Sequence, residues 1–157
     1  RKRFPENMEA WSQFFEFGSA DIFNLEAPDK IAAIIVEPIQ SVAGVYLANP
    51  AYYQSLRKFS NDHGICLIFD EVQTGTGRTG EWYAGTHWDV EPDIVTTAKG
   101  VGGGMPVGVV IVNELVARTV QPGDQASTFG GNPLAMAAGN AVLDIILEKG
   151  FFEKVDK

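Results

Sequence analysis

The feature that most limits how this chain can fold is a pair of short apolar runs separated by one helical segment. The first run covers residues 31–36, and the second covers residues 65–69 and ends at Asp70. Continuous runs rich in β-branched residues are typical of strands that are covered on both faces. Because strand, helix and strand follow one another within residues 31–70, we expect a βαβ unit with two parallel strands.

The segment between the two runs carries the start and stop signals of a helix. Asn49 followed by Pro50 combines an Asx cap with proline at the first helical position. Gly64 stands where a helix C-cap is expected. The apolar residues between them recur at helical spacing and are Tyr52, Tyr53, Leu56 and Phe59.

Two further strands are expected at residues 93–97 and 106–112. Only residues 98–105 lie between them, and a parallel crossover needs a dozen or more residues, so the fourth strand should run antiparallel to the third. The fold class is therefore α/β. We expect a three-layer α/β/α arrangement around a mixed, mostly parallel sheet.

Three more helices are expected. A short one covers residues 8–17, a second runs from the cap Asn113 to Arg118, and a longer one covers residues 134–149 after Asn132 and Pro133. The last is apolar almost all round, and Gly150 is expected to end it.

Length and composition predict one globular unit. A chain of 157 residues with 45% apolar and 20% charged side chains can bury a core. We interpret residues 1–157 as a single partial domain, with an irregular or helical lead-in over 1–30 and a core over 31–150. Both ends resemble cuts within a longer protein, because the chain starts without methionine and ends in a charged run.

Charge and cysteine content exclude several classes of function. A net charge of −8 repels phosphate backbones and anionic lipid, so we expect neither nucleic-acid nor membrane binding. No apolar stretch approaches the length of a membrane span. The single cysteine, Cys66, cannot form an internal disulfide, which favours a reducing, cytoplasmic location.

Glycine marks the candidate site. Nine of the 17 glycines lie between Gly75 and Gly108, in the loops after the second and third strands. Glycine lets a backbone approach a ligand closely, and ligands in open α/β sheets bind beyond the carboxyl ends of the strands. These loops and the strand end before them carry chemically useful side chains, namely Asp70, Glu71, Gln73 and Lys99.

One alternative is a dinucleotide site at residues 75–80, which match the pattern G-x-G-x-x-G. That pattern requires a glycine directly at the strand end and a helix that opens at once. Here residues 71–74 intervene and residues 81–86 form helices poorly. A phosphate loop containing Gly-Lys-Ser/Thr is absent, as is the G-x-S-x-G motif of a hydrolase.

A metal site is also disfavoured. His63 and Cys66 are close in sequence, but His87 is the only other histidine, so no ligand cluster forms. The simpler interpretation is that His63 lies at a helix end and Cys66 is a small core residue.

Lys99 and Asp70 remain as a pair. Most lysines are solvated surface residues, and an aspartate at a strand end is often only a turn residue. A lysine at the mouth of a buried sheet is instead partly desolvated and becomes a nucleophilic amine able to form a Schiff base. Together the two suit pyridoxal phosphate, with the lysine as aldimine and the carboxylate as partner of the pyridinium nitrogen.

Several motifs together resemble the class III, fold-type-I aminotransferases, such as acetylornithine, ornithine and 4-aminobutyrate aminotransferases. The resemblance covers about residues 31–150, the central part of the large domain in such enzymes. The motifs that carry it are residues 67–75 (LIFDEVQTG), 77–80 (GRTG), 91–94 (EPDI), 98–104 (AKGVGGG) and 127–133 (STFGGNP).

The resemblance implies a role for each matching residue. Lys99 would hold the internal aldimine and later move the substrate proton, and Asp70 would keep the pyridine nitrogen protonated. Val72 would pack on the ring, and Gln73 would hydrogen-bond its phenolic oxygen. Glu71 is grouped with these cofactor-binding residues.

The resemblance also implies a homodimer with shared active sites. Thr128 would donate a hydrogen bond to the cofactor phosphate of the neighbouring subunit, and Ser127 would lie near the substrate. The family's phosphate-binding loop, ring-stacking aromatic residue and C-terminal domain have no counterpart here, and Gln125–Ala126 replaces a common His-Gly pair. We therefore expect the 157-residue chain to be inactive alone.

The functional hypothesis is a transaminase that moves an amino group from an amino acid or ω-amine to a 2-oxo acid. The alternatives are a dinucleotide-binding half-domain of an oxidoreductase and an inactive structural remnant of the aminotransferase fold. Relatives acting on ornithine, acetylornithine or 4-aminobutyrate usually carry a glutamate five residues after the glutamate of Glu-Pro-Ile-Gln. Here that position is Val42, which is either ordinary packing or a sign of a different donor. Such a donor would present its own carboxylate near the reacting amine, or would be an ω-amine that is held differently.

Overall fold

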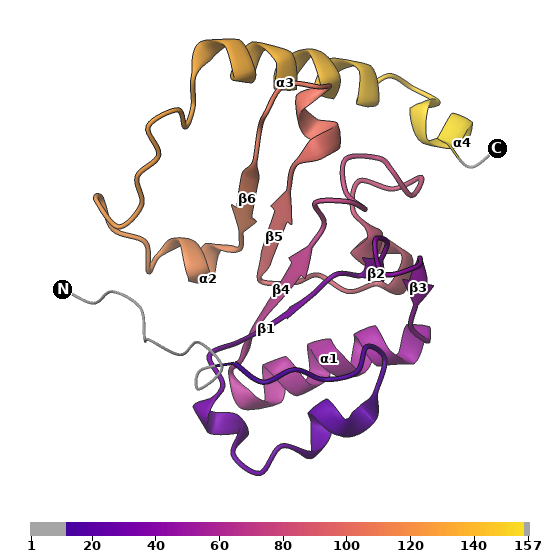
Figure 1. Cartoon of the computed structure of the whole chain (residues 1–157), viewed down its shortest axis with the longest axis vertical. Coiled ribbons are helices and arrows are strands. Elements are labelled where there is room, and N and C mark those ends of the chain that lie inside the picture. Colours follow the sequence, from indigo (N-terminus) through magenta and orange to yellow (C-terminus); the bar gives the residue numbers. More distant parts are fainter. Residues whose placement is uncertain (1–11, 156–157) are drawn as a thin grey trace.

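The computed structural model describes residues 12–155, and its centre is a four-stranded sheet (Figure 1). The strands, in their order across the sheet, are β1 (Ala33–Val36), β4 (Cys66–Asp70), β5 (Ile94–Thr97) and β6 (Val109–Val112). The first three are parallel, and β6 runs antiparallel to β5. The prediction of a mixed, mostly parallel sheet with an antiparallel fourth strand is confirmed.

Helix α1 (Pro50–His63) connects the first two strands of the sheet and has the caps that the sequence predicts. The side chain of Asn49 accepts a hydrogen bond from the Ala51 amide at 3.0 Å, and Pro50 opens the helix. Gly64 ends it in the left-handed conformation, with φ of 66°. Since glycine has no Cβ, it adopts this cap without steric cost.

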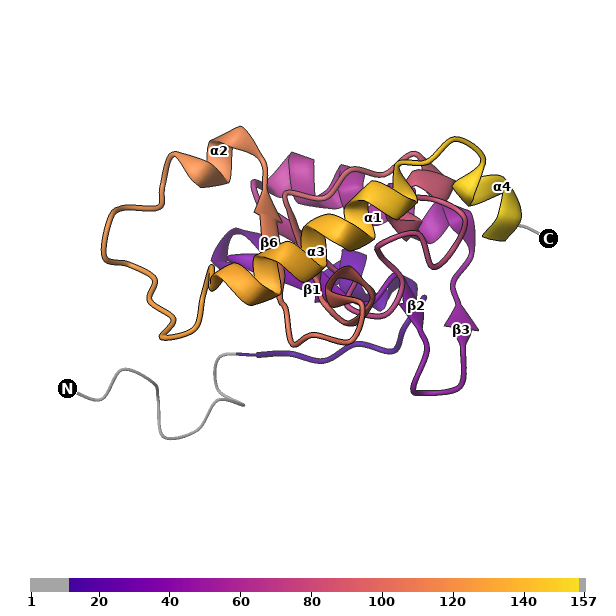
Figure 2. The ribbon, with the colours of Figure 1, turned by 90° about the horizontal axis from the view of Figure 1, so that it is seen from above.

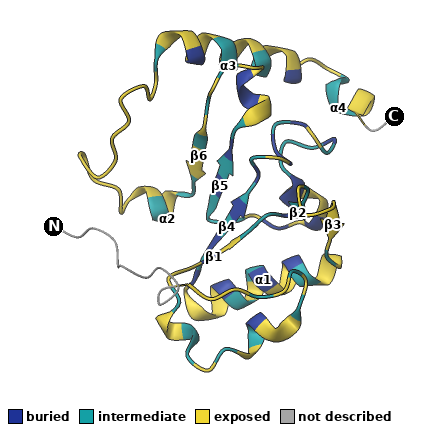
Figure 3. Ribbon diagram, in the orientation of Figure 1, coloured by how far each residue is buried: buried dark blue, intermediate teal, exposed yellow. Residues whose placement is uncertain are grey.

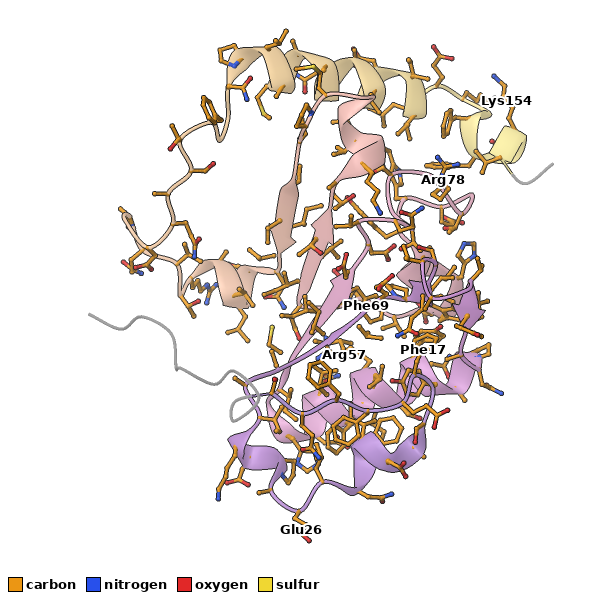
Figure 4. All side chains as sticks on the ribbon, viewed as in Figure 1. Phe17, Glu26, Arg57, Phe69, Arg78 and Lys154 are labelled. Carbon is orange, nitrogen blue, oxygen red and sulfur yellow. The ribbon has the colours of Figure 1, made fainter. Side chains whose placement is uncertain are left out.

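The core lies between α1 and one face of the sheet (Figure 3). Tyr53 and Leu56 of the helix are fully buried, as are Leu67 and Phe69 of β4. The Tyr53 ring stacks on Trp88 at 3.8 Å between centroids, and its hydroxyl donates to the Pro38 carbonyl at 2.6 Å. The aromatic lead-in packs on the same helix, where the Phe17 ring contacts Tyr52 edge to face at 5.9 Å between centroids (Figure 4).

The opposite face of the sheet is open at both of its edge strands. Ile35 of β1 is 66% exposed, and Val110 of β6 is 65% exposed. The prediction that residues 31–36 form a strand covered on both faces is therefore wrong for this chain. The apolar run is suited to two-sided burial, but within residues 12–155 only the side facing α1 is covered.

Smaller elements complete the chain. Their bounds are 3₁₀ helices η2 (Ala20–Asn24), η3 (Pro28–Lys30), η4 (Ala84–Trp88) and η5 (Lys99–Gly102), a hairpin of β2 (Ile39–Gln40) and β3 (Tyr46–Leu47), and helices α2 (Glu114–Ala117), α3 (Pro133–Ile146) and α4 (Phe151–Val155). The caps Asn113 and Asn132 are as predicted. The helix expected to run to residue 149 ends instead at Ile146.

The helix expected at residues 8–17 falls partly outside the described residues, and residues 12–17 are not helical. The hairpin and α4 were not predicted. Helix α3 crosses the upper end of the sheet in Figure 1 and packs on η5. The segment that joins α2 to α3 extends away from the sheet, as the view from above also shows (Figure 2).

Asp93 fixes the lower end of the sheet, where β5 begins. Its carboxylate accepts hydrogen bonds from the Leu67 amide at 2.8 Å, from Arg57 at 3.0 Å and from Asn113 at 2.7 Å. Its own amide donates to the Leu67 carbonyl at 2.8 Å. One side chain thus ties α1, β4, β5 and the end of β6 together.

We expect Asp93→Ala to lower the free energy of unfolding by about 2–4 kcal/mol, because it leaves Arg57 and two other donors without their acceptor. Asp62→Ala is the matched control. Asp62 pairs with Lys58 on the surface of α1, and its loss should cost at most about 0.5 kcal/mol. Urea unfolding of both variants measures the difference, and equal losses would contradict the role of Asp93.

Candidate active site

The candidate site is built where β4 and β5 end side by side. The two strands are parallel, with Asp70 opposite Thr96, so the loops that follow them leave the same edge of the sheet. Asp70 is half-buried, and its Oδ1 accepts hydrogen bonds from the Val72 amide at 3.0 Å and from the Thr96 hydroxyl at 3.4 Å. Among residues 12–155, no group donates to its Oδ2.

Lys99 opens η5, one residue after the end of β5. Its φ of 41° lies in the left-handed region, which residues other than glycine rarely adopt. Its amine donates a hydrogen bond to Oε1 of Gln73, from the loop after β4. Backbone strain of this kind is concentrated at functional sites, where the surrounding structure holds the residue in place.

A pair of threonine hydroxyls joins the loop after β4 to the end of β5, two residues before Lys99. Thr76 Oγ1 and Thr97 Oγ1 lie 3.1 Å apart, close enough for one to donate to the other. The sequence analysis missed both residues and Thr96. The available signal was the Thr-Thr pair at the end of a strand, two residues before the lysine.

The expectation that Lys99 is partly desolvated is wrong for this chain, because the residue is exposed. Gln73 beside it is also exposed, and Val72 is half-buried. Nothing within the described residues buries the Lys99 side chain. The amine is therefore open to a small molecule that approaches from solvent.

Glu71 points away from this group. Its side chain is fully buried and accepts hydrogen bonds from the Thr74 hydroxyl and from the Ala84 and Gly85 amides. Burial raises the pKa of the nearby Tyr83 phenol, and the negative charge of Glu71 raises it further. The observed partners of Glu71 are thus groups of the same chain.

Ser127 and Thr128 are not brought to Lys99. Both are exposed and lie in the segment between α2 and α3, which extends away from the sheet on the side of β6 (Figures 1 and 2).

Residues 75–80, which match the dinucleotide pattern, form a series of turns with no helix. The next helical segment is η4, which begins only at Ala84 and has five residues. A dinucleotide site needs a helix N-terminus directed at the pyrophosphate, so the geometry does not support that alternative.

Val42 lies in the turn between β2 and β3 and is 90% exposed. The interpretation of Val42 as ordinary packing therefore fails within the described residues.

A hollow of about 570 Å³ lies over β5 and β6, and its walls include Tyr83, Val95 and Ile111. Neither Asp70 nor Lys99 lines it, although Glu71 and Gly85 do. Within the described residues, no three or more histidine, cysteine, aspartate or glutamate side chains are grouped so that they could hold a metal ion. The same part of the chain has no helix of the length and apolar character needed to cross a membrane.

Comparison with known proteins gives one consistent result. The family model "Aminotransferase class-III" matches residues 5–157. An acetylornithine aminotransferase of Methanopyrus kandleri is 44% identical over 160 residues, which cover 100% of this chain and 41% of that protein. One of Caldanaerobacter subterraneus subsp. tengcongensis is 50% identical over 129 residues, covering 82% of this chain and 33% of that protein.

Among solved structures, the N-acetylornithine aminotransferase from Stenotrophomonas maltophilia K279a superposes with a TM-score of 0.80 at 33% identity. The match covers 92% of this chain and 37% of that one. The chain thus spans well under half the length of the proteins it resembles.

We expect Gly75→Ala to destabilise the loop that carries Gln73. An added Cβ would lie 2.8 Å from the Glu71 carbonyl oxygen and 3.1 Å from Thr97 Oγ1, so backbone must shift at a cost of about 1–3 kcal/mol. Gly108→Ala is the matched control, since a Cβ there meets nothing within 4 Å. Thermal unfolding of both variants checks this, and equal melting temperatures would contradict it.

Proposed function

Because this chain belongs to the class-III aminotransferase family, we propose that it is the central part of a pyridoxal-phosphate-dependent transaminase. The enzyme moves an amino group from an amino acid or an ω-amine to a 2-oxo acid. The observation that carries the proposal is the meeting of Lys99, Gln73 and Asp70 at the carboxyl edge of β4 and β5.

The residues at this edge fit the cofactor. The Lys99 amine is exposed and can attach to a carbonyl carbon. Asp70 has Oδ1 occupied by groups of this chain, whereas Oδ2 accepts nothing within the described residues and can pair with a ring nitrogen. When bound, pyridoxal phosphate supplies an electron sink for bond cleavage next to the substrate nitrogen.

The chain's own side chains then have distinct tasks. Lys99 would hold the cofactor, and its Nζ would accept and return a substrate proton. Asp70 keeps the ring nitrogen protonated, because a carboxylate stabilises the positive charge there. Gln73, which already contacts the Lys99 amine, hydrogen-bonds the phenolic oxygen, and Val72 packs on the ring.

We also propose a cytoplasmic homodimer whose active sites are shared. Ser127 and Thr128 are exposed on a segment that extends away from their own Lys99, which suits contacts with the neighbouring subunit's cofactor phosphate and substrate. The 157-residue chain should therefore catalyse almost nothing alone, because positioning supplies much of an enzyme's rate.

Borohydride reduction tests the proposal in the full-length enzyme. We expect wild type to retain reduced cofactor covalently at Lys99 and Lys99→Ala to retain none, as measured by mass spectrometry. Asp70→Asn should keep the linkage while kcat falls about 10²-fold or more, since an amide cannot stabilise the charged ring nitrogen. Asp89→Asn, at an exposed position after η4, is the control and should leave kcat unchanged.

Two results would reject specific parts of the proposal. Absence of a covalent adduct in wild type would favour the inactive remnant. Near-normal turnover in Asp70→Asn would reject the role of Asp70.

Val42 leads to a prediction about the amino donor. The two relatives described above are named acetylornithine aminotransferases. The family resemblance implies that enzymes of that type carry at this position a glutamate that pairs with an arginine and moves aside. Valine cannot pair with a cation, so such an arginine would remain free for a substrate carboxylate. We expect donors with a carboxylate beside the reacting amine to be preferred about tenfold in kcat/KM over acetylornithine.

A donor panel on wild type and on Val42→Glu measures this preference, and the variant should shift it towards acetylornithine. A strong wild-type preference for ornithine or acetylornithine would contradict the prediction.

A further inference from the structure

The carboxylate of Glu71 is the most completely enclosed acidic group next to the candidate site. The residue lies between Asp70 and the loop residues Val72 and Gln73, yet its exposed fraction is 0%. Oε2 accepts from the Thr74 hydroxyl at 2.5 Å and the Ala84 amide at 3.0 Å, and Oε1 accepts from the Gly85 amide at 3.1 Å. A small molecule bound at Lys99 has no exposed Glu71 atom to contact.

The same residue closes the loop through its backbone. The Glu71 amide donates to the Thr96 carbonyl at 2.8 Å, and its carbonyl accepts from the Gly75 amide at 2.9 Å. These bonds fix both ends of the turn over residues 71–75, whose exposed residue Gln73 accepts the hydrogen bond from Lys99. The orientation of Gln73 therefore depends on the turn that Glu71 holds.

The backbone at Gly85 allows its amide to reach Oε1 of Glu71. A Cβ at Gly85 would lie 2.6 Å from the Val90 carbonyl oxygen and 3.2 Å from the Phe69 ring, so only glycine fits there without a shift. Its amide can then reach Glu71. The start of η4 thus provides two backbone donors, from Ala84 and Gly85, to one side chain.

All three groups around the carboxylate are donors, and two of them are backbone amides that cannot reverse their role. Glutamine has nearly the same shape as glutamate but replaces one acceptor oxygen with an NH₂ donor. In one orientation that NH₂ faces the Ala84 amide, and in the other it faces the Gly85 amide. Either way, two donors oppose each other in a buried site, which is costly.

We propose that Glu71 is a positioning residue, whose buried carboxylate joins the 71–75 turn to the start of η4 and so holds Gln73 against Lys99. The expected effect of Glu71 on cofactor binding rests on the proposed function, in which Gln73 contacts a cofactor attached to Lys99. It also replaces the sequence-based interpretation of Glu71 as a cofactor contact.

The test compares Glu71→Gln with Glu114→Gln in the full-length enzyme. Glu114 is exposed on α2, where it pairs only with Arg118 among the described residues. We expect Glu71→Gln to speed amide hydrogen exchange in residues 71–76 and 84–86 of the cofactor-free protein. Its Kd for pyridoxal phosphate should rise about tenfold, and the pH midpoint of the bound cofactor's visible band should shift. Glu114→Gln should change none of these.

The outcomes separate the possible failures. If wild type does not bind pyridoxal phosphate, the proposed function fails. If wild type binds it and Glu71→Gln binds equally with the same band, or loses only thermal stability, the positioning role is overturned. If Glu71→Gln does not fold, Thr74→Val decides, because it removes one donor and keeps the carboxylate. An about threefold rise in Kd with faster exchange in residues 71–76 supports the role, and unchanged values overturn it.

Discussion

The site depends on the parallel pairing of β4 with β5. That pairing sets Asp70 opposite Thr96 and directs both following loops to one edge of the sheet, so that residues 26 positions apart in sequence meet as Gln73 and Lys99. Side chains alternate along a strand, so a shift of one residue in the register would turn Asp70 to the other face. Every interaction of the site therefore depends on a register that is fixed elsewhere in the sheet.

Two buried or half-buried carboxylates hold this arrangement from opposite ends. Asp93 joins α1, β4 and β6 where β5 begins, and Glu71 joins the loop after β4 to η4. At both carboxylates, backbone amides and polar side chains donate to one acidic group. These hydrogen bonds are stronger than isolated ion pairs on the surface, because the acceptor is charged and shielded from water. The two ends of the sheet are thus fixed by the same kind of contact.

Most of the fold could be predicted from local signals in the sequence, whereas contacts between distant segments could not be predicted. Asn49, Pro50 and Gly64 act within a few residues of themselves, and the structure confirms each. The Thr-Thr pair before Lys99 is visible in the sequence, but the approach of Thr76 to Thr97 depends on the sheet register, which no local pattern specifies. Glu71 was grouped with the cofactor-binding residues because it neighbours Asp70 in sequence, whereas its side chain is buried and bonded to Thr74, Ala84 and Gly85. The exposure of Ile35 depends on which segments are present, not on the apolar run itself.

The glycines after Lys99 show how a local pattern can have a cause other than a ligand. The sequence suggested that residues 100–104 let a ligand approach, but in the structure helix α3 approaches them. A Cβ at Gly103 would lie 2.8 Å from Val142 of α3, and the Val101 carbonyl faces Gly139 of the same helix. Small residues on both sides permit this close packing, which covers the segment directly after the strained Lys99. The position of the lysine therefore depends on α3, a helix that begins 34 residues further along the chain.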